Sequence, residues 1–176
     1  VTGFLGAGKT TLLNRILTAS HGLRIAVLVN DFGAVNIDAQ MIVNVEGETY
    51  SLSNGCICCT IRDDLVRAVL DVLNRPEPPE YIIIETSGVS DPLEVALTLR
   101  PINAIAIDSI LPVIDAEQIV SLDRQYAVLA MNQVGMADIV ILNKVDLVDA
   151  AGLEKARAYI RRVMPNSRVI ETTHAQ

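Results

Sequence analysis

The sequence predicts an α/β domain in which a mostly parallel sheet is covered by helices on both faces. Three observations point to this fold class. Apolar, β-branched runs alternate with longer helical patterns. Hydrophobic residues make up 51% of the 176 residues, whereas aromatic residues make up only 3%. No repeat, low-complexity block or flexible linker divides the chain, so we expect a single domain over residues 1–176.

The expected elements follow from these runs. Strands are predicted in the short β-branched runs at 24–30, 81–85, 110–115, 138–142 and 168–171. Helices are predicted in the longer patterns at 9–20, 61–74, 92–99, 125–134 and 151–163. Ligands of parallel α/β sheets bind beyond the carboxyl ends of the strands, so the residues that follow the strands are the candidates for function.

Charge and hydropathy exclude several classes of partner. The formal net charge is -7 at pH 7, so the composition lacks the basic surplus that holds DNA or RNA phosphates. No apolar run is long enough to cross a bilayer, and the chain does not open with the charged and apolar regions of a signal peptide. We therefore expect a cytoplasmic protein that binds neither nucleic acid nor membrane.

A glycine-rich segment near the start has the spacing of a phosphate-binding loop. Gly3, Gly8, Lys9 and Thr10 match the pattern G-x-x-x-x-G-K-[ST]. Glycines let such a P-loop turn with its backbone N–H groups inward, where they and the following helix N-terminus cradle phosphate oxygens. Lys9 is expected to neutralise the β- and γ-phosphates, and the Thr10 hydroxyl to bind Mg²⁺. The predicted fold class is therefore a three-layer α/β/α P-loop NTPase domain with a mostly parallel sheet.

The strand that should feed the P-loop is represented only by Val1 and Thr2. A P-loop follows a β-strand directly. We therefore expect a short apolar strand upstream of Val1 and interpret the chain as a fragment whose first strand is truncated.

The segment NKVD, which follows the strand predicted at 138–142, has the residues of a guanine-binding loop. The Asp146 carboxylate can accept hydrogen bonds from the guanine N1–H and 2-amino groups, which adenine does not offer in that arrangement. Asn143 is expected to tie this loop to the P-loop, and the Lys144 stem to cover the base. Four residues alone also fit a solvated loop, but their place after a P-loop favours GTP over ATP. The terminal stretch around His174 is expected beside the base if it closes the pocket.

The segment YIIIETSGVSDP predicts an acidic loop that, together with the P-loop, would form a phosphate switch. Glu85 stands at the carboxyl end of a strand made of three isoleucines, where it can hold Mg²⁺ directly or through water. The Gly88 N–H is a candidate sensor of the γ-phosphate. Ser90 or Asp91, placed before Pro92, also fits a helix cap, and the two interpretations are compatible.

Two further carboxylates follow the strand predicted at 24–30. Asp31 and Asp38, in the segment NDFGAVNID, are brought towards the same sheet edge. They are either switch or metal carboxylates or ordinary turn residues, and the sequence alone leaves both interpretations open.

All three cysteines lie in the segment SNGCICCT, at Cys56, Cys58 and Cys59. Thiolates bind zinc and cobalt, and the helix predicted directly after the cluster would lower the pKa of the thiols through its positive N-terminal end. Three thiolates leave a fourth ligand position, which suits a carried metal. The candidates for it are Asp31, Asp38, Glu85, water and a partner chain. A strained disulfide between Cys58 and Cys59, or packing of the thiols in the core, remains an alternative.

The segments GFLGAGKTTLLNRIL, NDFG...NID, NGCICC, ETSG.SDP and NKVD, in this order, resemble the nucleotide-binding domain of CobW-type metallochaperone GTPases. The resemblance covers essentially the whole chain, and the cysteine triplet between two GTPase motifs is its specific part. It implies a GTPase of slow intrinsic turnover that binds Zn²⁺, Co²⁺ or a related metal at a CxCC motif and links metal affinity to Mg²⁺-GTP.

The resemblance also implies roles for individual residues. The nucleotide-binding set is Gly3, Gly6, Ala7, Gly8, Lys9, Thr10, Thr11, Gly88, Asn143, Lys144 and Asp146. Catalysis is expected of Lys9, Thr10 and Glu85, with Thr10 and Glu85 holding Mg²⁺. The transition-metal set is Cys56, Cys58 and Cys59, with Asp31 as a further candidate.

The expected function is a switch in which hydrolysis of GTP to GDP and phosphate sets how tightly the metal is held. The implied partners are GTP, a transition-metal ion, a client metalloprotein or cobalamin-pathway enzyme, and a second copy of the chain. Two alternatives stay open: a metal-storage or zinc-responsive module in which the nucleotide is structural, and an accessory ATPase or kinase. From the resemblance we expect that residues 1–176 do not include the smaller C-terminal domain of many family members.

Overall fold

The strands of this protein are arranged in parallel. The computed structural model describes residues 1–30, 49–51, 60–121 and 124–176. Within them the strands pair in two sets of three, ordered β2-β1-β3 and β4-β5-β6, and every pair is parallel. The strands are β1 (Ile25–Asn30), β2 (Thr49–Ser51), β3 (Tyr81–Thr86), β4 (Val113–Asp115), β5 (Ile139–Asn143) and β6 (Arg168–Glu171). The predicted α/β class with a mostly parallel sheet is confirmed.

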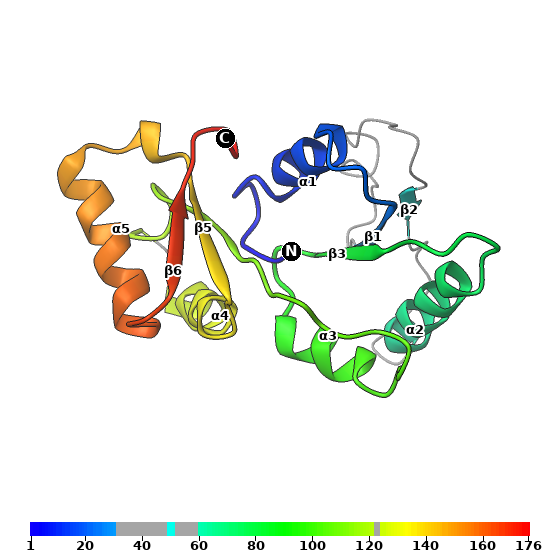
Figure 1. Ribbon diagram of the computed structural model, residues 1–176. Coiled ribbons are helices and arrows are strands. Elements are labelled where there is room, and N and C mark those ends of the chain that lie inside the picture. Colours follow the sequence, from blue (N-terminus) through cyan, green and yellow to red (C-terminus); the bar gives the residue numbers. More distant parts are fainter. Residues whose placement is uncertain (31–48, 52–59, 122–123) are drawn as a thin grey trace.

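Val1 and Thr2 join the two sets of strands. On the β3 side, the Thr86 N–H donates to the Val1 carbonyl at 3.0 Å. On the β4 side, the Thr2 N–H donates to the Leu111 carbonyl at 3.0 Å, and the Val113 N–H donates to the Thr2 carbonyl at 2.8 Å. These bonds continue the parallel ladder, so the two residues form a short central strand of one sheet, with the N-terminus between its halves (Figure 1).

Helices form a layer on each face of this sheet. They are α1 (Lys9–Thr18), α2 (Thr60–Leu73), α3 (Pro92–Leu99), α4 (Arg124–Gly135) and α5 (Ala150–Val163), with a short 3-10 helix η2 (Val145–Leu147) after β5. Among the described elements, α1 packs on one face and the other four α-helices pack on the opposite face. Figure 1 shows this three-layer arrangement, which the P-loop fold class predicts.

The alternation of side chains along the strands explains why both faces are apolar. In β1, Val27 and Val29 pack with Leu13 of α1, whereas Ala26 and Leu28 point the other way and pack with α2 and α3. Successive residues of a strand face opposite sides of the sheet. A strand covered on both faces must therefore be apolar along its buried length, as residues 25–29 (IAVLV) of β1 are.

Most predicted boundaries lie within two residues of the observed ones. The regular strand within 110–115 begins only at Val113, and the three residues of β2 are not anticipated by the pattern of apolar runs. Helix α1 ends at Thr18 because Ala19 has an extended backbone, with ψ of 144°. Asp91 caps α3 as predicted, since its Oδ1 accepts from the Leu93 N–H at 2.9 Å.

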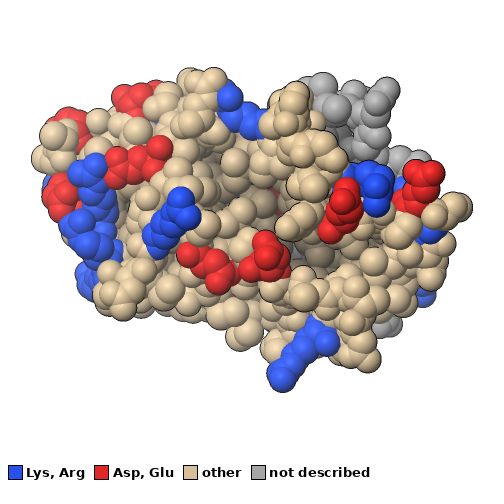
Figure 2. All heavy atoms as spheres, viewed as in Figure 1, with Lys and Arg blue, Asp and Glu red and all other residues tan. Residues whose placement is uncertain are grey.

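Several arginine side chains on the described surface are paired with carboxylates. Basic side chains gather over α5, at the left in Figure 2, where Arg157 donates to both carboxylate oxygens of Glu171 at 2.6 and 2.8 Å. This hydrogen bonding lowers the pKa of Glu171 and balances the arginine charge. None of the described helices is long and apolar enough to cross a membrane.

Candidate nucleotide-binding site

The P-loop has a backbone that glycine adopts more readily than other residues. Gly3, Gly6 and Gly8 have φ angles of 132°, 73° and 106°, in the region that L side chains rarely occupy. A Cβ at Gly3 would collide with the Val113 carbonyl, and a Cβ at Gly8 would collide with the Asn143 side chain. The glycine spacing in the sequence is therefore a steric requirement, because the loop lies directly against β4 and β5.

The start of α1 is suited to bind an anion. Gly8 is the N-cap residue, no side chain caps the helix, and its first turn carries no acidic residue. The first N–H groups of a helix lack partners within it and carry partial positive charge. Lys9 is buried at the same place, and its ammonium group donates to the Phe4 carbonyl at 3.3 Å. Thr10 and the exposed Thr11 follow in the first turn, so these groups together form a phosphate-binding cradle.

The structure brings together the two residues predicted to hold Mg²⁺. The Thr10 hydroxyl donates to Glu85 Oε1 at 3.3 Å. Glu85 is only 3% exposed and stands near the carboxyl end of β3. Mg²⁺ prefers hard oxygen ligands in octahedral geometry at about 2.1 Å, which puts adjacent ligands about 3 Å apart. The hydroxyl and carboxylate oxygens thus fit the ion in both type and spacing.

The loop between β3 and α3 rests on the P-loop. Gly88 is buried, and a Cβ built on it would lie 2.6 Å from the backbone nitrogen of Leu5. Real Cβ atoms do not come so close to backbone, so any larger residue would push the two loops apart. The predicted γ-phosphate sensor therefore sits in contact with the phosphate-binding loop.

Helix α4 holds the β3–α3 loop at its end next to α3. The sequence did not indicate this contact. Gln133 is fully buried, and its Nε2 donates to the Ser90 carbonyl at 3.3 Å. The neighbouring Asn132 donates to Asp91 Oδ2 at 3.3 Å. Gln133 Oε1 has no hydrogen-bond partner among the described residues. A buried polar atom without a partner is costly, so Gln133 is only partly hydrogen-bonded where it holds this loop.

Asn143 is the point at which three segments meet. Its Nδ2 donates to the Ala7 carbonyl of the P-loop at 2.9 Å. Its Oδ1 accepts from the Thr172 hydroxyl and from the Ala175 N–H, both at 3.0 Å. Asn143 is 2% exposed, and its side chain is hydrogen-bonded at both the nitrogen and the oxygen. The expected tie between the NKVD segment and the P-loop is present, and the stretch around His174 lies against the same residue.

Lys144 is held by a carboxylate that none of the sequence motifs includes. Its ammonium group lies 2.7 Å from Asp115 Oδ2, and its backbone is left-handed, with φ of 59°. Asp115 is buried and also accepts from the Glu117 and Gln118 N–H groups, at 2.9 and 3.1 Å. Its position at the carboxyl end of a predicted strand was the available signal. Asp146, which follows in η2, is exposed and open to a ligand.

The predicted transition-metal residues lie outside the described residues. These are Cys56, Cys58 and Cys59, together with Asp31 and Asp38. Within the ranges that the structure describes, no group of three His, Cys, Asp or Glu side chains could hold a metal ion. The cysteine assignment therefore stays a prediction.

The structure does describe the strand that leads into the cysteine segment. Ser51, the last residue of β2, pairs with Val29 of β1, and Val29 pairs with Glu85 of β3. Neighbouring strands lie about 4.8 Å apart, so Ser51 and Glu85 are separated by about 10 Å across the sheet. Cys56 follows Ser51 by five residues. The chain thus enters the cysteine segment from the same sheet edge that carries Glu85.

These features define the class of protein. A parallel sheet whose central strand feeds a P-loop, with a hydroxyl–carboxylate pair and an NKVD loop at the same edge, is a P-loop nucleotide-binding domain. The family model described as "CobW/HypB/UreG, nucleotide-binding domain" matches residues 1–171. The chain belongs to this family.

Relatives and solved structures agree with this assignment. The zinc chaperone YjiA of Escherichia coli (strain K12) is 35% identical over 99% of this chain and 56% of that protein. The zinc-regulated GTPase metalloprotein activator 1 of Dictyostelium discoideum is 33% identical over 99% of this chain and 45% of that protein. The crystal structure of Zn(II)-bound YjiA GTPase from E. coli superposes with a TM-score of 0.69 at 28% identity, covering 96% of this chain and 55% of that chain. The chain spans about half the length of the curated relatives it matches.

Replacing Asn143 by alanine tests whether this side chain joins the loops. Asn143→Ala leaves the Ala7 carbonyl, the Thr172 hydroxyl and the Ala175 N–H without their partner, so we expect the free energy of unfolding to fall by about 1–3 kcal/mol. The matched control is Asn74→Ala, at an exposed asparagine after α2, for which we expect a change within about 0.5 kcal/mol. Denaturant titration measures both. Equal effects of the two substitutions would contradict a joining role for Asn143.

Proposed function

We propose that this chain is the nucleotide-binding domain of a zinc metallochaperone, which binds Mg²⁺-GTP, hydrolyses it, and changes its affinity for zinc with the state of the nucleotide. The observation that carries the proposal is the Thr10–Glu85 hydrogen bond, because it joins the P-loop to the sheet edge from which the cysteine segment departs. Membership of the family, and relatives named for zinc and GTP, support it.

The cradle at the start of α1 binds the phosphates of the nucleotide. The uncapped N–H groups of the first turn donate to phosphate oxygens. The Lys9 ammonium group, which donates to the Phe4 carbonyl in this structure, turns to the β- and γ-phosphates when nucleotide binds. Thr10 Oγ1 and the Glu85 carboxylate, which lie within hydrogen-bonding distance of each other, would hold Mg²⁺. When bound, the ion neutralises charge that develops on the phosphate oxygens.

Hydrolysis transfers the γ-phosphoryl group to water. A water oxygen forms a bond to the γ-phosphorus as the bond from that phosphorus to the bridging oxygen breaks, so GDP leaves with the bonding electrons. Such a step needs mainly positioning and charge stabilisation. Lys9 supplies positive charge, and the Gly88 N–H donates to a γ-phosphate oxygen. Loss of that oxygen releases the loop, which is held at its other end by Gln133.

Zinc is the cargo in this proposal. The thiolates of Cys56, Cys58 and Cys59 bind it, and a helix N-terminus directly after the cluster, at Thr60, favours their ionised form. A nucleotide that binds or releases Glu85 acts on the edge shared with Ser51, at the entrance to the cysteine segment. This shared edge gives zinc a different environment in the GTP and GDP states, and that difference is what any change in affinity requires.

Guanine selection is assigned to the NKVD loop. The exposed Asp146 carboxylate accepts from the base N1–H and 2-amino groups. Lys144, held by Asp115, covers one face of the ring with its aliphatic stem. Asn143 keeps this loop at a fixed distance from the P-loop.

The following properties stay predictions: cobalt as a second cargo, slow turnover, a cytoplasmic location, pairing of two copies, and a metalloprotein or cobalamin-pathway client.

Zinc affinity measured in three nucleotide states tests the proposal. We expect the dissociation constant for zinc with Mg²⁺-GTP to differ from that with GDP by at least about fivefold, the lower end of common coupling energies. The measurement is a competitive titration against a chromophoric zinc chelator, with Mg²⁺-GTP, GDP or no nucleotide present. Equal zinc affinity in the three states assigns the chain to metal storage and contradicts the switch.

Two substitutions locate the zinc that this titration detects. Cys58→Ser is expected to weaken zinc binding by at least about tenfold, because a thiolate ligand is lost. His21→Ala is the control, since His21 is exposed and distant in sequence from the cysteines. Zinc binding that survives Cys58→Ser but is lost in His21→Ala would contradict the cysteine assignment.

Replacing Asp146 by alanine tests base selection. Asp146→Ala removes the acceptor of two guanine hydrogen bonds, so we expect GTP affinity to fall by about 100-fold, corresponding to about 3 kcal/mol. ATP affinity is expected to stay unchanged. Asp71→Ala, at an exposed carboxylate of α2, is the matched control. Isothermal titration with both nucleotides measures the effect, and an Asp146→Ala chain that keeps its preference for GTP contradicts the assignment.

A further inference from the structure

The stretch that follows β6 makes a turn in which two successive residues have a left-handed backbone. His174 and Ala175 have φ angles of 51° and 58°, a conformation that L residues other than glycine seldom adopt. Ala175 is also buried, at 8% exposed, and has no polar side chain that could ease this backbone. Such a conformation persists only where surrounding contacts hold it, and it is concentrated at functional sites. The contacts that hold the 172–175 turn therefore bear on function.

The NKVD loop holds the 172–175 turn from one side. Asn143 Oδ1 accepts from the Thr172 hydroxyl and from the Ala175 N–H, both at 3.0 Å. The Val145 N–H donates to the Thr172 carbonyl at 3.3 Å. Asp146, the proposed guanine acceptor, is the next residue of this loop. The turn thus borders the place that the proposed function assigns to the base.

Arg15 of α1 holds the turn from the other side. Its Nε donates to the His174 carbonyl at 2.9 Å, and Figure 1 shows the C-terminal end of the chain beside α1. Arg15 is half-buried and lies six residues after Lys9, which is about 9 Å further along the helix. The same helix therefore carries the phosphate cradle in its first turn and a contact to the 172–175 turn further on.

These two contacts divide the work between fold and turn. Up to Thr172 the chain is fixed by the sheet, since β6 pairs with β5 and the Thr172 N–H donates to the Leu142 carbonyl at 2.9 Å. Beyond Thr172, hydrogen bonds to Asn143 and Arg15 tie the turn to the rest of the described chain. One hydrogen bond near the surface contributes little to overall stability. Loss of the Arg15 contact therefore loosens the turn while the sheet stays intact.

We propose that Arg15 is a positioning residue for base selection, which holds the 172–175 turn in place beside the guanine pocket. A turn fixed on one side by Asn143 and on the other by Arg15 loses little freedom when a base binds against it, and such preorganisation raises affinity. Arg15 acts through the His174 carbonyl rather than on the phosphates. The inference rests on the proposed function, because it takes the ligand to be a guanine nucleotide.

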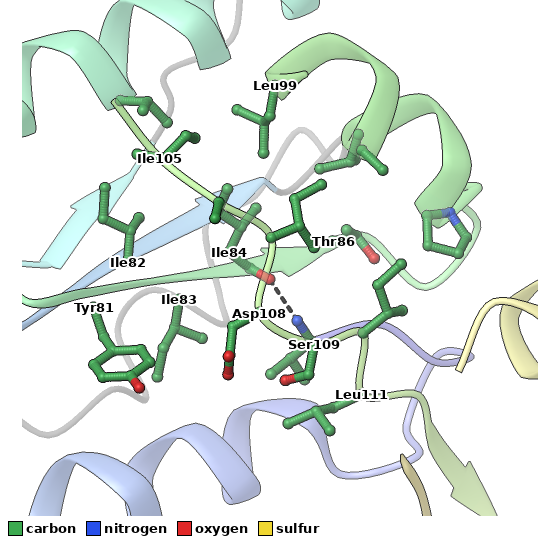
Figure 3. A pocket seen from close by; sticks show the side chains of 18 of the residues that line it. Tyr81, Ile82, Ile83, Ile84, Thr86, Leu99, Ile105, Asp108, Ser109 and Leu111 are labelled. Carbon is green, nitrogen blue, oxygen red and sulfur yellow. Dashed lines mark hydrogen bonds between the residues drawn. The ribbon is translucent and has the colours of Figure 1, made fainter. Parts of the chain in front are cut away.

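Arg24 provides a matched control at the amino-terminal end of β1. Its Nε also donates to a backbone carbonyl, that of Pro78, at 3.2 Å. The Tyr81 N–H donates to the Arg24 carbonyl at 3.2 Å, and Tyr81 lines the cavity of about 610 Å³ shown in Figure 3. Neither Arg15 nor the 172–175 turn lines that cavity. Arg24→Ala thus removes an arginine charge and a hydrogen bond of the same kind, away from the turn.

The unaltered chain, Arg15→Ala and Arg24→Ala are compared in three measurements. Competition against a fluorescent guanine nucleotide gives the affinities for slowly hydrolysed analogues of GTP and ATP, with Mg²⁺. We expect Arg15→Ala to weaken the GTP analogue by at least about tenfold and to leave the ATP analogue unchanged. Amide hydrogen exchange at Ala175 is expected to become at least about tenfold faster. The melting temperature should change by less than about 2 °C, and Arg24→Ala should leave all three quantities unchanged.

Four results overturn the proposal. Equal weakening of the GTP and ATP analogues in Arg15→Ala means that the arginine charge acts on the phosphates. A melting temperature lowered by more than about 5 °C makes Arg15 a structural contact. Equal effects of Arg15→Ala and Arg24→Ala, or a preference for GTP that Arg15→Ala leaves unchanged, contradict the role of Arg15 alone. An unaltered chain that binds both analogues equally contradicts the proposed function, and this inference with it.

Discussion

The buried amide of Asn143 is the contact on which the nucleotide site depends. It reaches from the end of β5 to the Ala7 carbonyl in the P-loop and leaves no room for a side chain at Gly8. Because the P-loop is fixed there, Thr10 at the start of α1 comes within hydrogen-bonding distance of Glu85. An amide is suited to this position, since it offers a donor to one segment and an acceptor to the others.

The second constraint is the parallel sheet, which gathers separate segments at one edge. The strands β2, β1 and β3 end side by side, so the entrance to the cysteine segment lies about 10 Å from Glu85, two strand spacings away. Val1 and Thr2 connect this half of the sheet to β4 and hold the P-loop between the halves. The proposed linkage of zinc to nucleotide requires no long pathway, because the chain enters the proposed zinc segment from a strand end two strands away from Glu85.

The parts of the site that could be predicted are those with local causes. The P-loop pattern reflects backbone angles at individual glycines, and the runs IAVLVN and YIIIET reflect burial on both faces of single strands. What the sequence did not reveal depends on contacts between distant segments. Asp115 and Lys144 are 29 positions apart, and nothing in either segment alone indicates their pairing.

Helix α4 and the end of the chain also make contacts that depend on distant segments. Gln133 lies in a helical pattern where a glutamine usually faces water, yet here it is buried against Ser90. Thr172 and Ala175 bind Asn143 only because β6 returns the chain to that edge. Strand β2 has only three residues, too few for a pattern of apolar runs, and it is recognised by its parallel pairing with β1.

The central claim is that nucleotide and zinc influence each other through this shared edge. Linkage between two binding sites is reciprocal, so zinc must change the affinity for Mg²⁺-GTP by the same factor as Mg²⁺-GTP changes the affinity for zinc. The most direct measurement is the dissociation constant of a slowly hydrolysed GTP analogue, with Mg²⁺, for the zinc-free and the zinc-saturated chain. We predict a difference of at least about fivefold between the two. Equal affinities would contradict the account, because two sites without a coupling free energy cannot form a switch.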